Sequence, residues 1–157
     1  MQLFLVHHGD AVGSEIDPQR PLSRLGQERV VRAAEAAAGR AAHPAVIWHS
    51  GKLRARQTAE AFLRVCHPLA EFSATRDMHP GDSPQWMRDR LRGETRDVMI
   101  VGHFPHLPRL LGLLLANPDG SSAEFPPHGV VALSSDDKGQ TWKETWRWDG
   151  SKTVPCA

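Results

Sequence analysis

The chain has 157 residues, of which 40% are hydrophobic and 24% charged, and its 19 lysines and arginines nearly balance 18 aspartates and glutamates. This composition excludes global disorder and fibrous classes and predicts that residues 1–157 form a single domain. A formal net charge of +1 argues against a broad nucleic-acid surface, whereas 15 arginines and nine histidines leave local anion sites open.

The sequence also bears on compartment. Its longest apolar run, residues 110–116, is far shorter than the roughly 20 residues that a membrane-spanning helix needs. No basic segment precedes the first apolar residues and no small-residue cleavage site follows them, so we expect no secretory signal. The two cysteines, Cys66 and Cys156, form no CxxC pair, which fits a reducing compartment. We therefore expect a cytoplasmic protein without a membrane segment.

Apolar runs and helical patterns alternate along the chain. In order, the patterns predict a strand at 2–7, a helix at 23–38 between the cap residues Ser23 and Gly39, a strand at 45–49, a helix at 52–65, a helix at 84–91, a strand at 97–102 and a helix at 107–116. A closing hairpin of strands 129–135 and 140–148 places Trp142, Trp146 and Trp148 on one strand face. This order predicts a three-layer α/β sandwich: a largely parallel sheet flanked by helices, with an antiparallel element near one edge.

Histidines end or directly follow three of the predicted strands, at His7 and His8, at His49 and at His103. Because ligands of open α/β sheets bind beyond the carboxyl ends of the strands, we expect these histidines to converge. Arg54, which begins the next helix, can face the same cleft. A neutral imidazole can attack phosphorus, a guanidinium can neutralise phosphoryl oxygens, and a second imidazole can donate to them. The combination favours phosphoryl-transfer chemistry.

Three motifs in their order and spacing resemble the histidine phosphatase superfamily. The segment LVHHGDA at 5–11 resembles its Arg-His-Gly signature, SGKLRARQT at 50–58 its S-x-x-x-R-A-x-Q-T segment, and VGHFP at 101–105 its G-H-x-P segment. The segments at 17–23 and 78–82, and the absence of a large inserted cap, further resemble the branch of SixA phosphohistidine phosphatases. The resemblance covers most of residues 1–135 and implies a phosphoglycerate mutase-like fold.

The resemblance also implies a mechanism without metal or cofactor. His8 would attack phosphorus and become phosphohistidine, water would then release inorganic phosphate, and His103 and Arg54 would hold the phosphoryl oxygens. The remaining expected phosphate or substrate contacts are His7, Gly9, Arg20, Ser50 and His79. The implied substrate is a phosphohistidine-bearing protein, with no nucleic acid and no membrane as partner.

The chain departs from the family signature at His7, which stands where the motif has arginine. A neutral imidazole offers one donor and gains its charge only near its ordinary pKa of about 6.5, whereas a guanidinium offers five donors and a permanent charge. Phosphate affinity should therefore be weaker. The hypothesis that follows is that activity is low at neutral pH and rises as His7 becomes protonated, until protonation of His8 removes the nucleophile.

Three alternatives remain open. The protein could be a small-molecule phosphomonoesterase, although the candidate acids for an alcohol leaving group, Asp10, His79 and Asp82, are equally suited to turns and caps. It could be a weakly active or inactive phospho-binding pseudophosphatase because of His7. A metal site is a further possibility, and its ligands would come from His7, His8, His49, His103 and His106. We read His106 as a residue of the pocket rim or surface.

Overall fold

Six strands form one mixed sheet in the computed structural model, which describes residues 1–152. The order is β3 (Glu71–Ala74), β2 (Val46–His49), β4 (Val98–Gly102), β1 (Gln2–His7), β5 (Val130–Ser134), β6 (Lys143–Trp148). The first four run parallel, whereas β5 is antiparallel to β1 and β6 to β5. The predicted fold class, with its antiparallel element at one edge, is confirmed.

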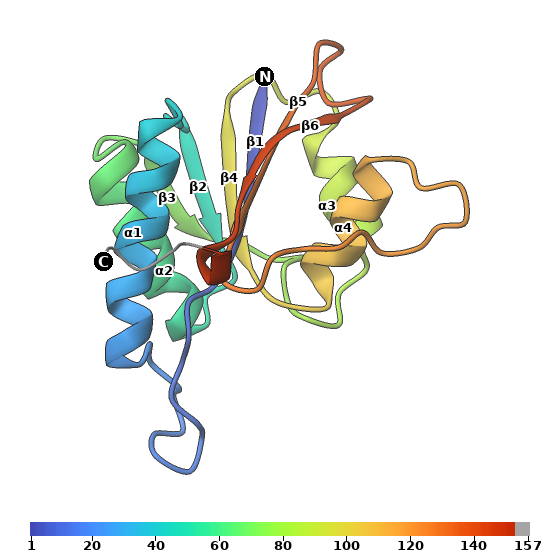
Figure 1. The fold of residues 1–157 in the computed structure, drawn as a ribbon. Coiled ribbons are helices and arrows are strands. Elements are labelled where there is room, and N and C mark those ends of the chain that lie inside the picture. The colour runs from blue at the N-terminus through green and yellow to red at the C-terminus, as the bar shows by residue number, and fades with distance from the viewer. Residues whose placement is uncertain (153–157) are drawn as a thin grey trace.

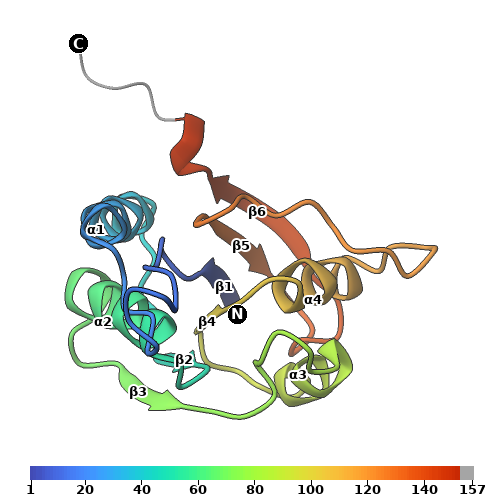
Figure 2. The same ribbon diagram turned by 90° about the horizontal axis from the view of Figure 1, so that it is seen from below.

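Two pairs of helices cover the sheet (Figures 1 and 2). Helices α1 (Arg24–Gly39) and α2 (Leu53–Cys66) pack on one face, and α3 (Pro84–Leu91) and α4 (His106–Leu114) on the other. Side chains alternate between the two faces along each strand, so β1 sends Leu3 and Leu5 to the α3 and α4 side and Phe4 and Val6 to the α1 and α2 side. Burial on both faces explains why the central strands are continuous apolar runs.

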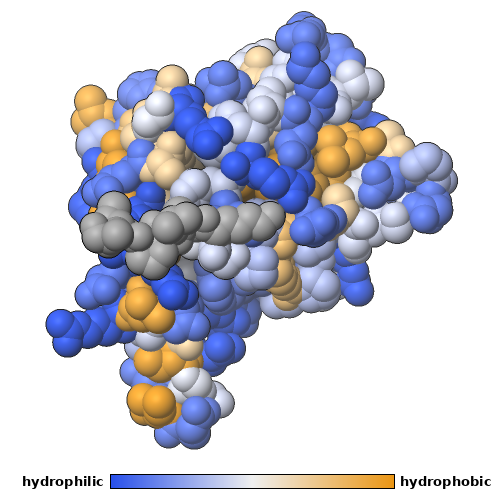
Figure 3. All heavy atoms as spheres, viewed as in Figure 1, coloured by the Kyte–Doolittle hydropathy of each residue, from blue (hydrophilic) through white to orange (hydrophobic). Residues whose placement is uncertain are grey.

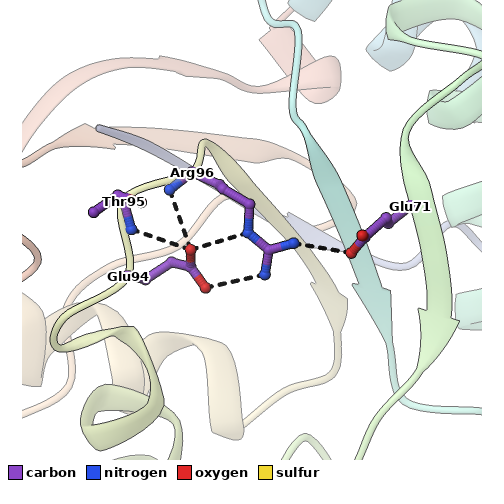
Figure 4. Close-up of polar contacts among 4 residues, drawn as sticks. All are labelled: Glu71, Glu94, Thr95 and Arg96. Carbon is purple, nitrogen blue, oxygen red and sulfur yellow. Dashed lines mark hydrogen bonds and ion pairs between the residues drawn. The ribbon is translucent and has the colours of Figure 1, made fainter.

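Strand β3 was missing from the sequence-based prediction. Its four side chains are exposed or half-buried, so the segment carries no apolar run. Pairing with β2 defines it, and Arg96 ties its first residue to the loop before β4 (Figure 4). Arg96 donates to Glu71 at 2.9 Å and to Glu94 at 3.0 Å, and the hydrogen bond from Arg96 lowers the pKa of Glu94 to about 2.

The ends of α1 match the prediction in part. Ser23 accepts the Gly26 N–H at 2.9 Å, as an N-cap serine does. Gly39 is the last helical residue, but the left-handed residue that closes the helix is Ala41, at φ 62°, and Ala42 donates back to Ala37. The glycine therefore marks the end without making the turn.

The predicted tryptophan face is wrong. Trp142 packs on the α3 and α4 side, whereas Trp146 and Trp148 pack on the α1 and α2 side. The register between β5 and β6 shifts between Ala132 and Leu133, and an extra residue in one strand reverses the side to which later residues point.

Within residues 1–152, none of the helices has the length and apolar character needed to span a membrane. Cys66 is buried and free, while Cys156 lies outside the described residues.

Candidate functional site

The candidate site lies where β1, β2 and β4 end. His7 is the last residue of β1 and is in register with Gly102, the last residue of β4, so His8 and His103 emerge side by side. Their ring centroids are 5.0 Å apart. Ser50 follows β2, and Arg54 lies in the first turn of α2. The structure thus brings together residues from three segments at the carboxyl ends of the parallel strands, where the sequence predicts the site.

His8 is held as a neutral imidazole with a free nitrogen. Its Nδ1 donates to the Gly9 carbonyl oxygen at 2.7 Å, which leaves the lone pair on Nε2. Burial, which outweighs the hydrogen bond to Gly9, lowers the pKa of His8 to about 4, and the charge of Arg54 adds to the effect. At neutral pH the ring is therefore unprotonated on Nε2, the form that attacks phosphorus.

Gly9 supports His8 through its backbone. Its N–H donates to Thr58 Oγ1 at 2.9 Å, and that hydroxyl donates to the Arg54 carbonyl at 2.8 Å, which ties the loop after β1 to α2. A Cβ at Gly9 would lie 2.4 Å from Val30 Cγ1. The expected phosphate contact is not available from this amide, because the N–H is already bonded. Gly9 instead permits close packing against α1.

His7 is locked between two rings. Phe104 stacks on it at a centroid distance of 3.9 Å and His128 at 4.8 Å, and only 8% of His7 is exposed. Its Nδ1 accepts the His128 backbone N–H at 2.8 Å, so the ring proton lies on Nε2. Burial, followed by the charge of His8, lowers the pKa of His7 to about 2.

The geometry of His7 argues against the hypothesis that activity rises as His7 becomes protonated. A cationic His7 would need a proton on Nδ1, where the His128 N–H already points. His7 stays neutral over the physiological range and presents a single N–H donor from Nε2. The position that resembles the motif arginine thus supplies a donor without a charge.

Ser50 and His103 form a buried pair. Ser50 Oγ and His103 Nε2 share a hydrogen bond of 2.6 Å, and Ser50 Oγ also accepts the Lys52 N–H at 3.3 Å. Burial, followed by the charge of His8, lowers the pKa of His103 to about 3. His103 Nδ1 has no hydrogen-bond partner among the described residues. In this geometry Ser50 Oγ contacts His103, and the expected phosphate contact of Ser50 stays a prediction.

Two guanidinium groups remain without carboxylates. Neither Arg54 nor Arg20 has an ion pair within residues 1–152, and Arg54 Nε is buried without any partner. Arg20 Nε donates only to the Val12 carbonyl, at 3.1 Å. Burial, and after it the charge of Arg20, lowers the pKa of Arg54. Arg96 is neutralised by two glutamates (Figure 4), whereas the guanidinium groups of Arg54 and Arg20 are available to bind an anion.

Two histidines that could have joined the site do not. His49 is buried, accepts the Gly51 N–H at 3.1 Å on Nδ1 and packs against Phe72 of β3, at 5.0 Å between ring centroids. His106 was predicted at the rim or surface, but it is fully buried and neither ring nitrogen has a partner in the described structure. It begins α4, whose apolar face turns the ring into the core.

The other polar candidates lie at the margin. His79 is exposed, and its N–H donates to Asp82 Oδ2 at 3.0 Å in a turn. Asp10 Oδ2 accepts the Ser23 hydroxyl at 2.6 Å at the start of α1. The two candidate carboxylate acids are therefore engaged in local structure.

His128 is a site residue that the sequence analysis missed. It precedes β5, which runs antiparallel to β1, so the start of β5 lies beside the end of β1. The available signal was its position directly before the strand 129–135, but only the pairing of β5 with β1 gives that position meaning.

One group of histidines within the described residues is close enough together to hold a metal ion. It consists of His7, His8 and His128, whose ligand atoms all lie within 4.8 Å of one another. Their donor set fits a metal poorly. A histidine ligand needs a free lone pair, yet His7 carries its proton on Nε2 and accepts a hydrogen bond on Nδ1. Only two lone pairs remain, on His8 and His128, and a zinc site has three or four protein ligands.

A separate cavity of about 570 Å³ lies along α1 and α2, lined by charged residues and by Leu22, Val30 and Ala61. None of the histidines of the site lines it. The loop between β1 and α1 protrudes from the same edge as the site (Figure 1), and it carries Ile16 with 74% of its surface exposed. Hydrophobic atoms are visible on this protrusion in Figure 3.

No protein-family model and no curated protein matches the chain. Solved structures do. The protein histidine phosphatase SixA, solved with tungstate, aligns with a TM-score of 0.81 and 20% identity over 96% of this chain and 98% of its own. A candidate SixA phosphohistidine phosphatase from Agrobacterium tumefaciens aligns with a TM-score of 0.76 and 24% identity over 94% and 96% of the two chains. Phosphoglycerate mutase from Plasmodium falciparum aligns with a TM-score of 0.71 and 15% identity over 98% and 93%. The chain therefore has the fold of SixA and phosphoglycerate mutase, as its motifs led us to expect.

Proposed function

We propose that the protein is a phosphatase that hydrolyses phosphohistidine on a protein through a phosphohistidine intermediate on His8. The observation that carries the proposal is the state of His8: a neutral ring with Nδ1 bonded to Gly9 and Nε2 free. Its centroid lies 5.0 Å from that of His103, and the charges of Arg54 and Arg20 act on it. A nucleophile beside donors and cations without carboxylates is what phosphoryl transfer requires.

In the first step His8 Nε2 attacks phosphorus, the new P–N bond forms, and the bond to the leaving group breaks. Arg54 neutralises the equatorial oxygens, and the His7 Nε2–H donates to one of them. His103, held by Ser50, has its ring centroid 5.0 Å from that of His8 and contributes a second imidazole. In the second step water attacks phosphorus, the P–N bond breaks, and inorganic phosphate leaves.

Two observations support a protein substrate. The solved structures named SixA are phosphohistidine phosphatases by name, and this chain shares their fold over almost its whole length. The loop that protrudes from the same end of the sheet as the site exposes Ile16, which is available for contact with a protein. The product of the reaction is a histidine side chain and phosphate.

The test is acid-labile labelling of His8 by a phosphohistidine protein or by phosphoramidate, followed by phosphate release. We expect label and turnover in the wild type and neither in His8→Ala. The matched control is His43→Ala, since His43 is exposed and precedes β2, at the end of the strands opposite to the site. Binding of phosphate without label and without release would favour the alternative of a phospho-binding pseudophosphatase and defeat the proposal.

A further inference from the structure

His128 is held in the site by two hydrogen bonds. Its backbone N–H donates to His7 Nδ1 at 2.8 Å, and its own Nδ1 lies 2.6 Å from the His8 carbonyl oxygen. Its backbone lies in the left-handed region, at φ 54°, which a non-glycine residue adopts only at a cost. A strained residue bonded to both neighbouring histidines is positioned by the fold.

These bonds decide which nitrogen of His128 can exchange a proton. A carbonyl oxygen only accepts, so Nδ1 must carry the hydrogen that it donates to His8. Nε2 is therefore the nitrogen that takes up or releases a proton. The ring is half-buried, so water can reach it, and a ring nitrogen of His128 lies within 4.8 Å of ring nitrogens of His7 and His8.

The two rings beside His128 cannot fill this role. His7 is locked in one neutral form, and His8 is the nucleophile. The charged or titratable groups that act on these two rings are His103 after β4, Arg54 on α2, Arg20 in the loop before α1, and His128 itself. None is a carboxylate. Asp10 and Asp82, the carboxylates that sequence analysis considered, bond within a helix cap and a turn.

We propose that His128 is the acid and base of this site, and that it extends hydrolysis from P–N bonds to phosphate monoesters. This inference rests on the proposed function. In the first step His8 Nε2 bonds to phosphorus, the P–O bond breaks, and the proton on His128 Nε2 passes to the leaving oxygen, so that a neutral alcohol departs. In the second step water bonds to phosphorus, its proton returns to His128 Nε2, and the P–N bond breaks.

The test compares substrates whose leaving groups need a proton to different degrees. The variant His128→Asn keeps the backbone N–H for His7, places an amide N–H where Nδ1 donates to His8, and suits a left-handed backbone. It removes the exchangeable proton together with the ring that stacks on His7. The panel is phosphoramidate, 4-nitrophenyl phosphate, phenyl phosphate and an alkyl phosphate, with His43→Asn as the control.

We expect His128→Asn to lose about 100-fold or more in kcat on the alkyl phosphate, less on phenyl phosphate, and little on 4-nitrophenyl phosphate, because a general acid contributes roughly 10²- to 10⁴-fold. A loss of equal size on all four substrates would overturn the proposal.

The labelling experiment separates this inference from the function on which it rests. If His8 is labelled but His128→Asn loses equally on all four substrates, only the role of His128 is refuted and the proposed function stands. Selective loss in His128→Asn without any label on His8 defeats the covalent intermediate and leaves the acid in place.

Discussion

Acid should destabilise this protein through His7, and the size of the effect follows from the site. The unfolded chain binds a proton on His7 near the ordinary histidine pKa of about 6.5, whereas burial lowers the folded pKa to about 2. Because the unfolded state binds more protons, stability contributed by neutral His7 is present above pH 6.5 and is lost as pH falls toward the folded pKa.

The magnitude is large enough to measure. At pH 5, one and a half units below the pKa of the unfolded state, one such histidine costs about 2 kcal/mol relative to pH 7.5. Only 8% of His7 is exposed, and its Nδ1 accepts from His128, so solvent does not relieve this cost. The same linkage applies to His8 and His103, whose folded pKa values are about 4 and about 3.

The assay is urea denaturation at pH 7.5 and pH 5 for the wild type and His7→Phe. Phenylalanine can keep the stack with Phe104 and His128, and the unpaired His128 N–H destabilises the variant equally at both pH values. We expect the wild type to lose about 2 kcal/mol more than the variant on acidification. Equal losses in the two proteins would show that His7 is not buried as a neutral ring.

Three further predictions concern packing and charge. Gly9→Ala should lower the free energy of unfolding by about 1–3 kcal/mol in denaturation, since its Cβ would lie 2.4 Å from Val30; no change would mean that α1 adjusts freely. Arg54→Gln should weaken tungstate or phosphate binding at least about 10-fold by calorimetry, whereas Arg56→Gln, which breaks an exposed pair with a glutamate, should not; equal effects would refute the role of Arg54. His106→Leu should raise the free energy of unfolding by about 1 kcal/mol, and with it the midpoint of thermal unfolding, because neither ring nitrogen is bonded. A lower midpoint would indicate that the ring has a hydrogen-bond partner.

Much of the site follows from local sequence because its central residues lie at the ends of parallel strands. His8 and His103 follow apolar runs, and β1 and β4 are neighbours in register, so the two rings meet. His49 also ends a strand, but β4 lies between β2 and β1, and its ring turns toward Phe72 at the outer strand. The sequence pattern predicts that the site lies at the carboxyl ends of the strands, while strand order decides which histidines are in contact.

His128 could not be found in this way. Its place in the site depends on β5 running antiparallel to β1, with Val130 opposite Val6. The direction and neighbour of a strand are set by packing of the whole sheet and leave no mark in a run such as residues 130–134. Charge has the same limit, because the sequence alone does not distinguish Arg96, which two glutamates neutralise, from Arg54, which has no ion pair in the described structure.

The two unusual features of the site explain each other. A histidine at position 7 cannot carry the charge of an arginine, and its Nδ1 is left as a buried acceptor that needs a donor. The His128 N–H supplies that donor, and the strained backbone that directs it also brings the His128 ring over His7. In the proposed reaction, position 7 contributes a neutral donor, Arg54 the permanent charge, and His128 the mobile proton. Replacing His7 by arginine would therefore add charge but leave the His128 N–H unpaired. The effect of a substitution at position 7 thus depends on the residue at position 128.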